Sequence, residues 1–85
     1  MPAKDVRHEL EALRRRVHNV KPREIIRIAE RAGWVWRNTE GSHATYVKEG
    51  FPFPLTIKLH DLGGDLVRSL LRQIESSLYE EEEEE

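Results

Sequence analysis

A glycine, a serine and a histidine follow one another at positions 41–43, where a turn is expected to lead into a strand. Histidine is the only side chain whose unperturbed pKa, about 6.5, lets it exchange a proton near neutral pH. His43, held at the start of a strand, is therefore a candidate general acid or base. The simpler alternative is a surface histidine in a turn, and the surrounding elements decide between the two.

Other side chains around His43 could bind a nucleic acid. The cations could neutralise phosphates, a second histidine could carry a proton across the sheet from His43, and an exposed indole could stack on a base. The alternatives are ordinary strand charges, a strand-end histidine with a structural hydrogen bond, and a core aromatic. The candidates are Arg37, Ser42, Lys48, Lys58, His60 and Trp36, whereas Trp34 is expected to be buried.

Two helices are predicted before the glycine, serine and histidine. Residues 4–18 carry apolar side chains at spacings of four, three and four, which predicts an amphipathic helix. A second helix is predicted from residues 21–24, where a proline and a glutamate suit a first turn, up to Gly33, a typical helix stop.

Three strands and a third helix are predicted after Gly33. The strands are 34–37, 43–48 and 55–60, with a turn at 38–41, and Asp65 is the predicted N-cap of the last helix. This order predicts an α+β fold in which a three-stranded antiparallel sheet has helices on one face. The other face of the sheet is then open.

The composition predicts one small, soluble, cytoplasmic domain. The chain has 85 residues, no cysteine and no apolar run long enough for a signal peptide or membrane helix. The formal net charge is −2, but residues 1–79 carry fourteen basic against ten acidic side chains, a net +4. Residues 80–85 are all glutamate, and we expect this acidic tail to be disordered. No His-x-x-x-His spacing is present, and neither a metal nor another cofactor is expected.

Residues 22–77 resemble the HicA (YcfA-like) toxin family. The family begins with a helix that ends in glycine and an aromatic, as in residues 24–34 here, and continues into Gly-Ser-His with an aromatic three residues later, here Tyr46. A strand that ends near a histidine follows, matched by residues 55–60. The last family element is a helix with an Arg-Ser-Ile-Leu-Arg-Gln-like stretch, and residues 68–73 read Arg-Ser-Leu-Leu-Arg-Gln.

The resemblance implies a metal-independent endoribonuclease (an mRNA interferase) that is the toxin of a type II toxin–antitoxin pair. It implies a double-stranded-RNA-binding-domain-like fold, mRNA as substrate, a HicB-like antitoxin as partner, and His43 as the catalytic residue. On this basis we expect residues 1–20 to be an N-terminal helical extension, 21–79 the HicA-like domain and 80–85 the tail.

The sequence departs from the family pattern at two positions near the predicted site. Many members have a second histidine where this chain has Ala44, and a proline is frequent where it has Lys58. Two alternatives therefore remain open: a non-catalytic RNA-binding module of the same fold, and a protein-interaction domain whose first helix mediates oligomerisation.

Overall fold

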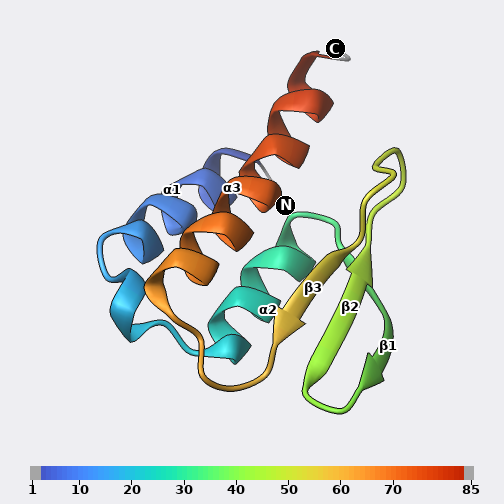
Figure 1. Cartoon of the computed structure of the whole chain (residues 1–85). Coiled ribbons are helices and arrows are strands. Elements are labelled where there is room, and N and C mark those ends of the chain that lie inside the picture. The colour runs from blue at the N-terminus through green and yellow to red at the C-terminus, as the bar shows by residue number, and fades with distance from the viewer. Residues whose placement is uncertain (1–2, 84–85) are drawn as a thin grey trace.

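The computed structural model describes the backbone of residues 3–83 and the side chains of residues 5–78. Helices begin and end the described part of the chain, and three strands lie between α2 and α3 (Figure 1). In chain order the elements are α1 (Ala3–Arg14), the 3₁₀ helix η1 (Val17–Asn19), α2 (Pro22–Arg31), β1 (Val35–Glu40), β2 (His43–Val47), β3 (Leu55–Lys58) and α3 (Gly64–Glu83).

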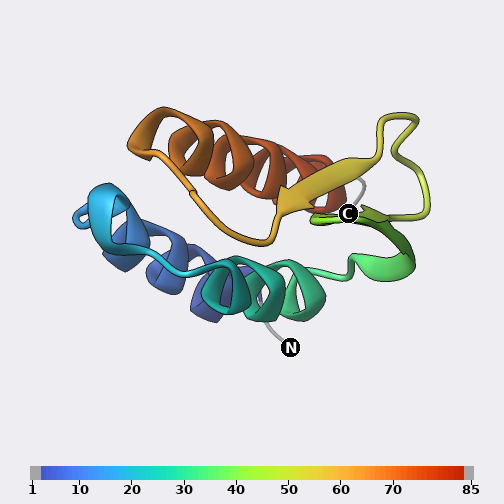
Figure 2. The same cartoon turned by 60° about the horizontal axis from the view of Figure 1, so that its bottom comes forward.

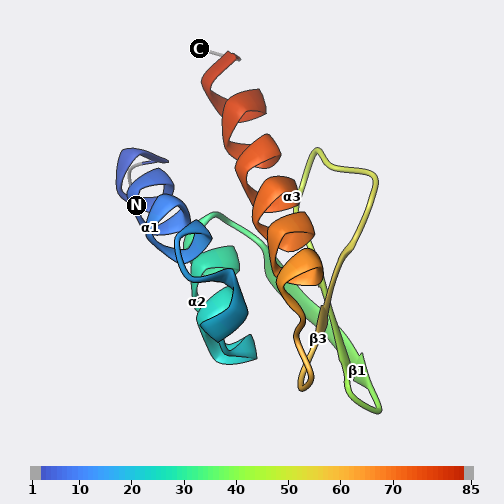
Figure 3. The same cartoon turned by 60° about the vertical axis from the view of Figure 1, so that its left-hand side comes forward.

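The strands form one antiparallel sheet in the order β1-β2-β3. Helices α2 and α3 contact β3, and α1 contacts both of these helices. Figure 2 shows α3 stacked over the layer formed by α1 and α2, and Figure 3 shows the helices on one side of the molecule with the sheet on the other. The predicted α+β fold, with the order α-β-β-β-α after an additional first helix, is confirmed.

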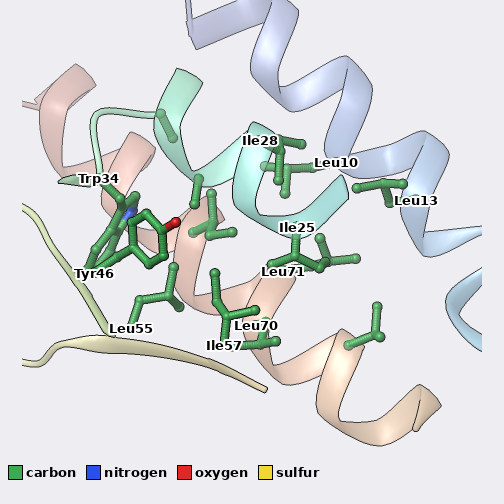
Figure 4. Close-up of a cluster of buried hydrophobic side chains, with 14 of the residues drawn as sticks. Leu10, Leu13, Ile25, Ile28, Trp34, Tyr46, Leu55, Ile57, Leu70 and Leu71 are labelled. Atoms are coloured by element: carbon green, nitrogen blue, oxygen red, sulfur yellow. The ribbon is translucent and has the colours of Figure 1, made fainter. Parts of the chain in front are cut away.

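One hydrophobic core joins all three helices to the sheet (Figure 4). Helix α1 contributes the apolar stripe that the sequence predicts, and Val6, Leu10 and Leu13 are all buried. They lie in the same cluster as Ile57 of β3 and Leu71 of α3. The first helix therefore packs against residues 21–78 and does not project from them.

Two ion pairs tie the helical layer together at its surface. Arg14 of α1 pairs with Glu75 of α3, and Arg31 of α2 pairs with Glu9 of α1. All four side chains are partly exposed, so each pair stabilises the fold by only about 0.2–1 kcal/mol. The buried apolar contacts hold α1 in place.

Helix α2 ends in a motif that sets the direction of β1. The backbone N–H of Trp34 donates to the carbonyl of Ala29 at 2.9 Å, and that of Gly33 donates to the carbonyl of Glu30 at 3.1 Å. This is a Schellman motif, with Gly33 at a φ of 100° where a side chain would be strained. The predicted glycine stop is confirmed, and Trp34, which follows it, is 2% exposed.

The sheet boundaries differ from the predicted ones. Strand β1 continues to Glu40, because its polar residues pair with β2 in spite of their preference for turns. The turn is consequently only two residues long. Strand β3 ends at Lys58, two residues earlier than predicted.

Helix α3 differs from the prediction at both ends. It begins at Gly64, and the N–H of Val67 donates to the carbonyl of Gly63, so Asp65 lies in the first turn and is not the N-cap. The helix continues to Glu83, into the part of the chain where a disordered tail was expected. Glutamate has a high helix propensity, and extending an existing helix adds one hydrogen bond per residue. The last two residues of the tail lie outside the described part of the chain.

None of the described helices combines the length and apolar character needed to cross a bilayer.

Candidate functional site

The predicted catalytic histidine lies directly after a tight hairpin turn. Gly41 and Ser42 connect β1 to β2, and His43 is the first residue of β2. Gly41 has a φ of 57° and Ser42 does not have a positive φ, as expected for a type II′ turn with glycine in its first central position. The N–H of Leu59 donates to the carbonyl of Ser42 at 2.7 Å, which fixes the turn against the end of β3. His43 is therefore an exposed side chain on a well-anchored backbone.

The sheet register aligns three ionisable side chains in one row. Glu40 of β1 pairs with His43, and His43 pairs with Lys58 of β3. Directly opposed residues share a face, with Cβ atoms about 4.5–5.5 Å apart. The buried Ala44 and Ile57 point to the helix side, so the row Glu40–His43–Lys58 lies on the open face.

A second, uncharged polar row lies beside the first. Asn38 of β1 pairs with Thr45 of β2, which pairs with Thr56 of β3. These side chains are exposed or half-buried. At the end of the sheet away from the hairpin, the open face becomes apolar, where Val35 pairs with Val47. Near the hairpin, the open face thus offers charges and hydrogen-bonding groups to a ligand.

Trp36 and Arg37 lie at an irregularity in β1. The register shifts between Trp36 and Asn38, which makes Arg37 the extra residue of a β-bulge. Trp36 pairs with the buried Tyr46 and so belongs to the helix-side face, although it is 55% exposed. Its indole N–H donates to the hydroxyl of Thr39 at 2.8 Å. Of these two candidates, neither belongs to the His43 row.

Lys48 lies on the opposite face from His43. Its side chain is 8% exposed, its ammonium donates to the hydroxyl of Ser77 at 3.2 Å, and it lies 5.5 Å from the centre of the Phe51 ring. Ser77 is itself fully buried and also accepts a hydrogen bond from the Trp34 indole. The arrangement is that of a buried structural lysine.

His60 is exposed and lies in a bend, two residues past the end of β3. The ladder partner of His43 on that strand is Lys58, so the register gives no support to a cross-strand pair of histidines. Among the predicted candidates, Lys58 is the one that the sheet brings beside His43. Ser42, in the turn, directly precedes His43 in the chain.

Glu40 is the member of the row that sequence reasoning missed. The sequence predicts a turn at residues 38–41, and a glutamate in a turn gives no indication of a site. The available signal was the glycine at position 41, because a two-residue hairpin with glycine first makes residues 40 and 43 direct partners.

The two departures from the family pattern have different positions on the sheet. Ala44 is 3% exposed and faces the helices, so a histidine there would point away from His43 and into the core. Lys58 lies on the open face beside His43. The aromatic three residues after His43, Tyr46, is a core residue, and burial, with a smaller effect of the Glu30 charge, raises the pKa of its hydroxyl.

Among the side chains of residues 5–78, no group of three histidine, aspartate or glutamate residues is arranged to hold a metal ion.

Comparison with known protein families gives one match. The model of the HicA toxin of bacterial toxin–antitoxin systems matches residues 22–75, which is more than half of the chain. Neither the curated protein sequences nor the solved structures contain a significant match. The match begins at the first residue of α2 and ends within α3, so it includes the whole sheet, the hairpin and His43. The chain therefore belongs to the HicA toxin family.

Proposed function

We propose that this chain is a metal-independent endoribonuclease that cleaves mRNA in the cytoplasm. The observation that carries the proposal is the row Glu40–His43–Lys58 on the open face of the sheet. It combines a carboxylate, an imidazole and an ammonium, which are groups that can move protons and offset phosphate charge. Membership of the HicA family makes RNA the expected substrate and an antitoxin, HicB-like in our proposal, the expected partner.

The reaction needs two proton transfers and one centre of positive charge. A base takes the proton of the ribose 2′-OH, and the 2′-oxygen forms a bond to the adjacent phosphorus. The bond from phosphorus to the 5′-oxygen breaks, and an acid donates a proton to that oxygen. The products are a 2′,3′-cyclic phosphate and a 5′-hydroxyl.

Each step can be assigned to a member of the row. A carboxylate is available as a base at neutral pH, so Glu40 accepts the proton of the 2′-OH. His43 donates the proton to the leaving oxygen, and Lys58 stabilises the charge that develops on the phosphate oxygens. In this assignment Glu40 takes the part of second proton carrier that the sequence alone suggested for His60.

The position of Ala44 supports a catalytic role for His43. Because residue 44 faces the helices, a second histidine there would not extend the row on the open face. Its replacement by alanine leaves the row's three ionisable side chains unchanged. We therefore favour the enzyme over a non-catalytic RNA-binding module.

The protein-interaction alternative has less support. It assigns oligomerisation to the first helix, but the apolar stripe of that helix is buried within the chain itself. An oligomer built on α1 would have to use its polar surface.

The test is cleavage of an end-labelled single-stranded RNA by the purified chain. His43→Ala should lower the rate by about 10²–10⁴-fold, and Glu40→Gln should lower it as well. His60→Ala is the matched control, an exposed histidine outside the row, and should leave the rate unchanged. The product should carry a 2′,3′-cyclic phosphate, and EDTA should have no effect.

Equal cleavage by wild type and His43→Ala would exclude the role given to His43. RNA binding without cleavage at any pH would favour the binding module instead. In cells, wild type but not His43→Ala should arrest growth and degrade transcripts, and co-expression of the antitoxin should reverse both effects.

A further inference from the structure

Three cations line one surface hollow along the first half of α2: Lys21, which precedes the helix, and Arg23 and Arg27, which lie in it. All three side chains are exposed. Within residues 5–78 none of these side chains is hydrogen-bonded to an acid or within ion-pair distance of one. We call these three residues the α2 cation cluster.

The charge of the acid next to this cluster, Glu24, is already balanced by another arginine. Glu24 accepts hydrogen bonds from the Arg16 guanidinium and from the backbone N–H of Lys21. The Arg16 bond is the main reason why the pKa of Glu24 is lowered to about 2, and the charge of Arg23 adds a small effect. The positive end of the α2 dipole lies in the same place. The charge at the start of α2 is therefore net positive, although the formal net charge of the chain is −2.

Lys21 and Arg23 of the cluster lie next to the end of the strand that carries Lys58, whereas Arg27 lies one turn further along α2. A hollow of about 370 Å³ is lined by Lys21, Arg23, Ile26 and Leu59, together with Pro22, and Leu59 directly follows Lys58. Figures 1 and 3 both show the start of α2, the end of β3 and the β1–β2 hairpin at the same end of the molecule. Because β3 is an edge strand, an RNA strand that leaves the open face at Lys58 can pass over that edge to α2.

We propose that the α2 cation cluster binds the phosphates of the RNA strand that flanks the scissile bond. Arg23 and Arg27 are four residues apart, so they share one face of α2 and are separated by about 6 Å along its axis. The arginine fork suits phosphate oxygens, and two such groups in line suit a flexible polyanion. That the bound strand flanks a scissile bond at the His43 row rests on the proposed function, but binding of RNA by the cluster can be measured without cleavage.

The experiment compares two double variants in the His43→Ala background, where the RNA stays intact. One is Arg23→Gln/Arg27→Gln. The control is Arg15→Gln/Arg72→Gln, which removes two other exposed arginines that form no ion pair within the described side chains. Both variants lose two charges, and glutamine has a helix propensity close to that of arginine. The measurement is the affinity for a twelve-nucleotide single-stranded RNA over a range of salt concentrations.

The cluster variant should bind about tenfold more weakly at 0.1 M salt, with a slope of log affinity against log salt smaller by about 1.4, since each phosphate contact contributes about 0.7. The control should keep the wild-type slope. When His43 is retained, the Arg23→Gln/Arg27→Gln variant should cleave a dinucleotide at the wild-type rate and the longer RNA more slowly than wild type.

Equal slopes of log affinity against log salt for the two variants would overturn the proposal. So would a loss of cleavage rate in the cluster variant that is the same for the dinucleotide and the longer RNA. If the wild type cleaves no RNA but the salt dependence of binding is reduced in the cluster variant and not in the control, the proposed function fails and the binding site stands. If RNA is cleaved and the slopes are equal, the proposed function stands and this inference fails.

Discussion

At the scale of the residue, the position of a side chain on the sheet decides its role. Lys48 and Lys58 have the same chemistry, and the sequence offers both as phosphate ligands. The register puts Lys58 beside His43 on the open face, while Lys48 is buried against Ser77 and Phe51. Alternation along β2 likewise separates His43 from Ala44.

Substitution by methionine, which keeps the length of the side chain and removes its charge, separates the two lysines. Lys58→Met should reduce the slope of log affinity against log salt for single-stranded RNA by about 0.7, and should lower the cleavage rate. Lys48→Met should leave both unchanged, because its ammonium is not accessible to a phosphate. Salt titrations of RNA binding by the two variants check this, and a loss of slope in Lys48→Met would contradict it.

At the scale of the element, the junction between α2 and β1 depends on Gly33. Its positive φ would strain any other residue by about 1–2 kcal/mol. In addition, a Cβ atom here would lie 3.2 Å from the Cε atom of Lys48, closer than ordinary van der Waals contact. Gly50 is a natural control, because it has a φ of 91° but no atom within 4 Å of the place that a Cβ would occupy.

Gly33→Ala should therefore destabilise the chain more than Gly50→Ala. Both variants carry the backbone strain, and the difference between them reports the contact with Lys48. Urea denaturation monitored by tryptophan fluorescence measures the two free energies of unfolding. If Gly50→Ala is the more harmful substitution, Lys48 is not held where the structure has it.

How far the sequence predicts these elements depends on the signal each one carries. All three helices have apolar stripes, but only α2 has clear signals at both ends, so α2 and its stop at Gly33 are predicted correctly. Residues 38–40 have turn-like side chains, and only pairing with β2 makes them a strand, which is why Glu40 was missed. Alternation along the predicted strand places Lys48 on the face opposite to His43, but its burial depends on contacts such as that with Ser77, which lies 29 residues later.

At the scale of the whole molecule, the family-specific part does not form the core by itself. The HicA match begins at residue 22, but Leu10 of α1 is 1% exposed and belongs to the same cluster as Ile28 and Leu71. A domain of this size buries a small core, so the loss of one large side chain removes a substantial part of its stability. Without α1, the apolar residues of α2 and α3 that now face it would be exposed to water.

Leu10→Ala should lower the free energy of unfolding by about 2–5 kcal/mol, because the side chain is fully buried and leaves a cavity. The control is Val35→Ala on the edge strand, where the valine is 63% exposed and the loss should stay below about 0.5 kcal/mol. Urea denaturation of both variants gives the comparison, and RNA cleavage at low temperature shows whether the folded fraction keeps its activity. Since α1 packs on α2 and α3 and the His43 row lies on the open face of the sheet, the remaining folded molecules should cleave at the wild-type rate. A loss below about 1 kcal/mol for Leu10→Ala would mean that α1 contributes little to the stability of residues 21–78 and is an extension of them. A large loss would mean that the first helix is an integral part of the fold, so that the smallest stable unit includes residues outside the family match.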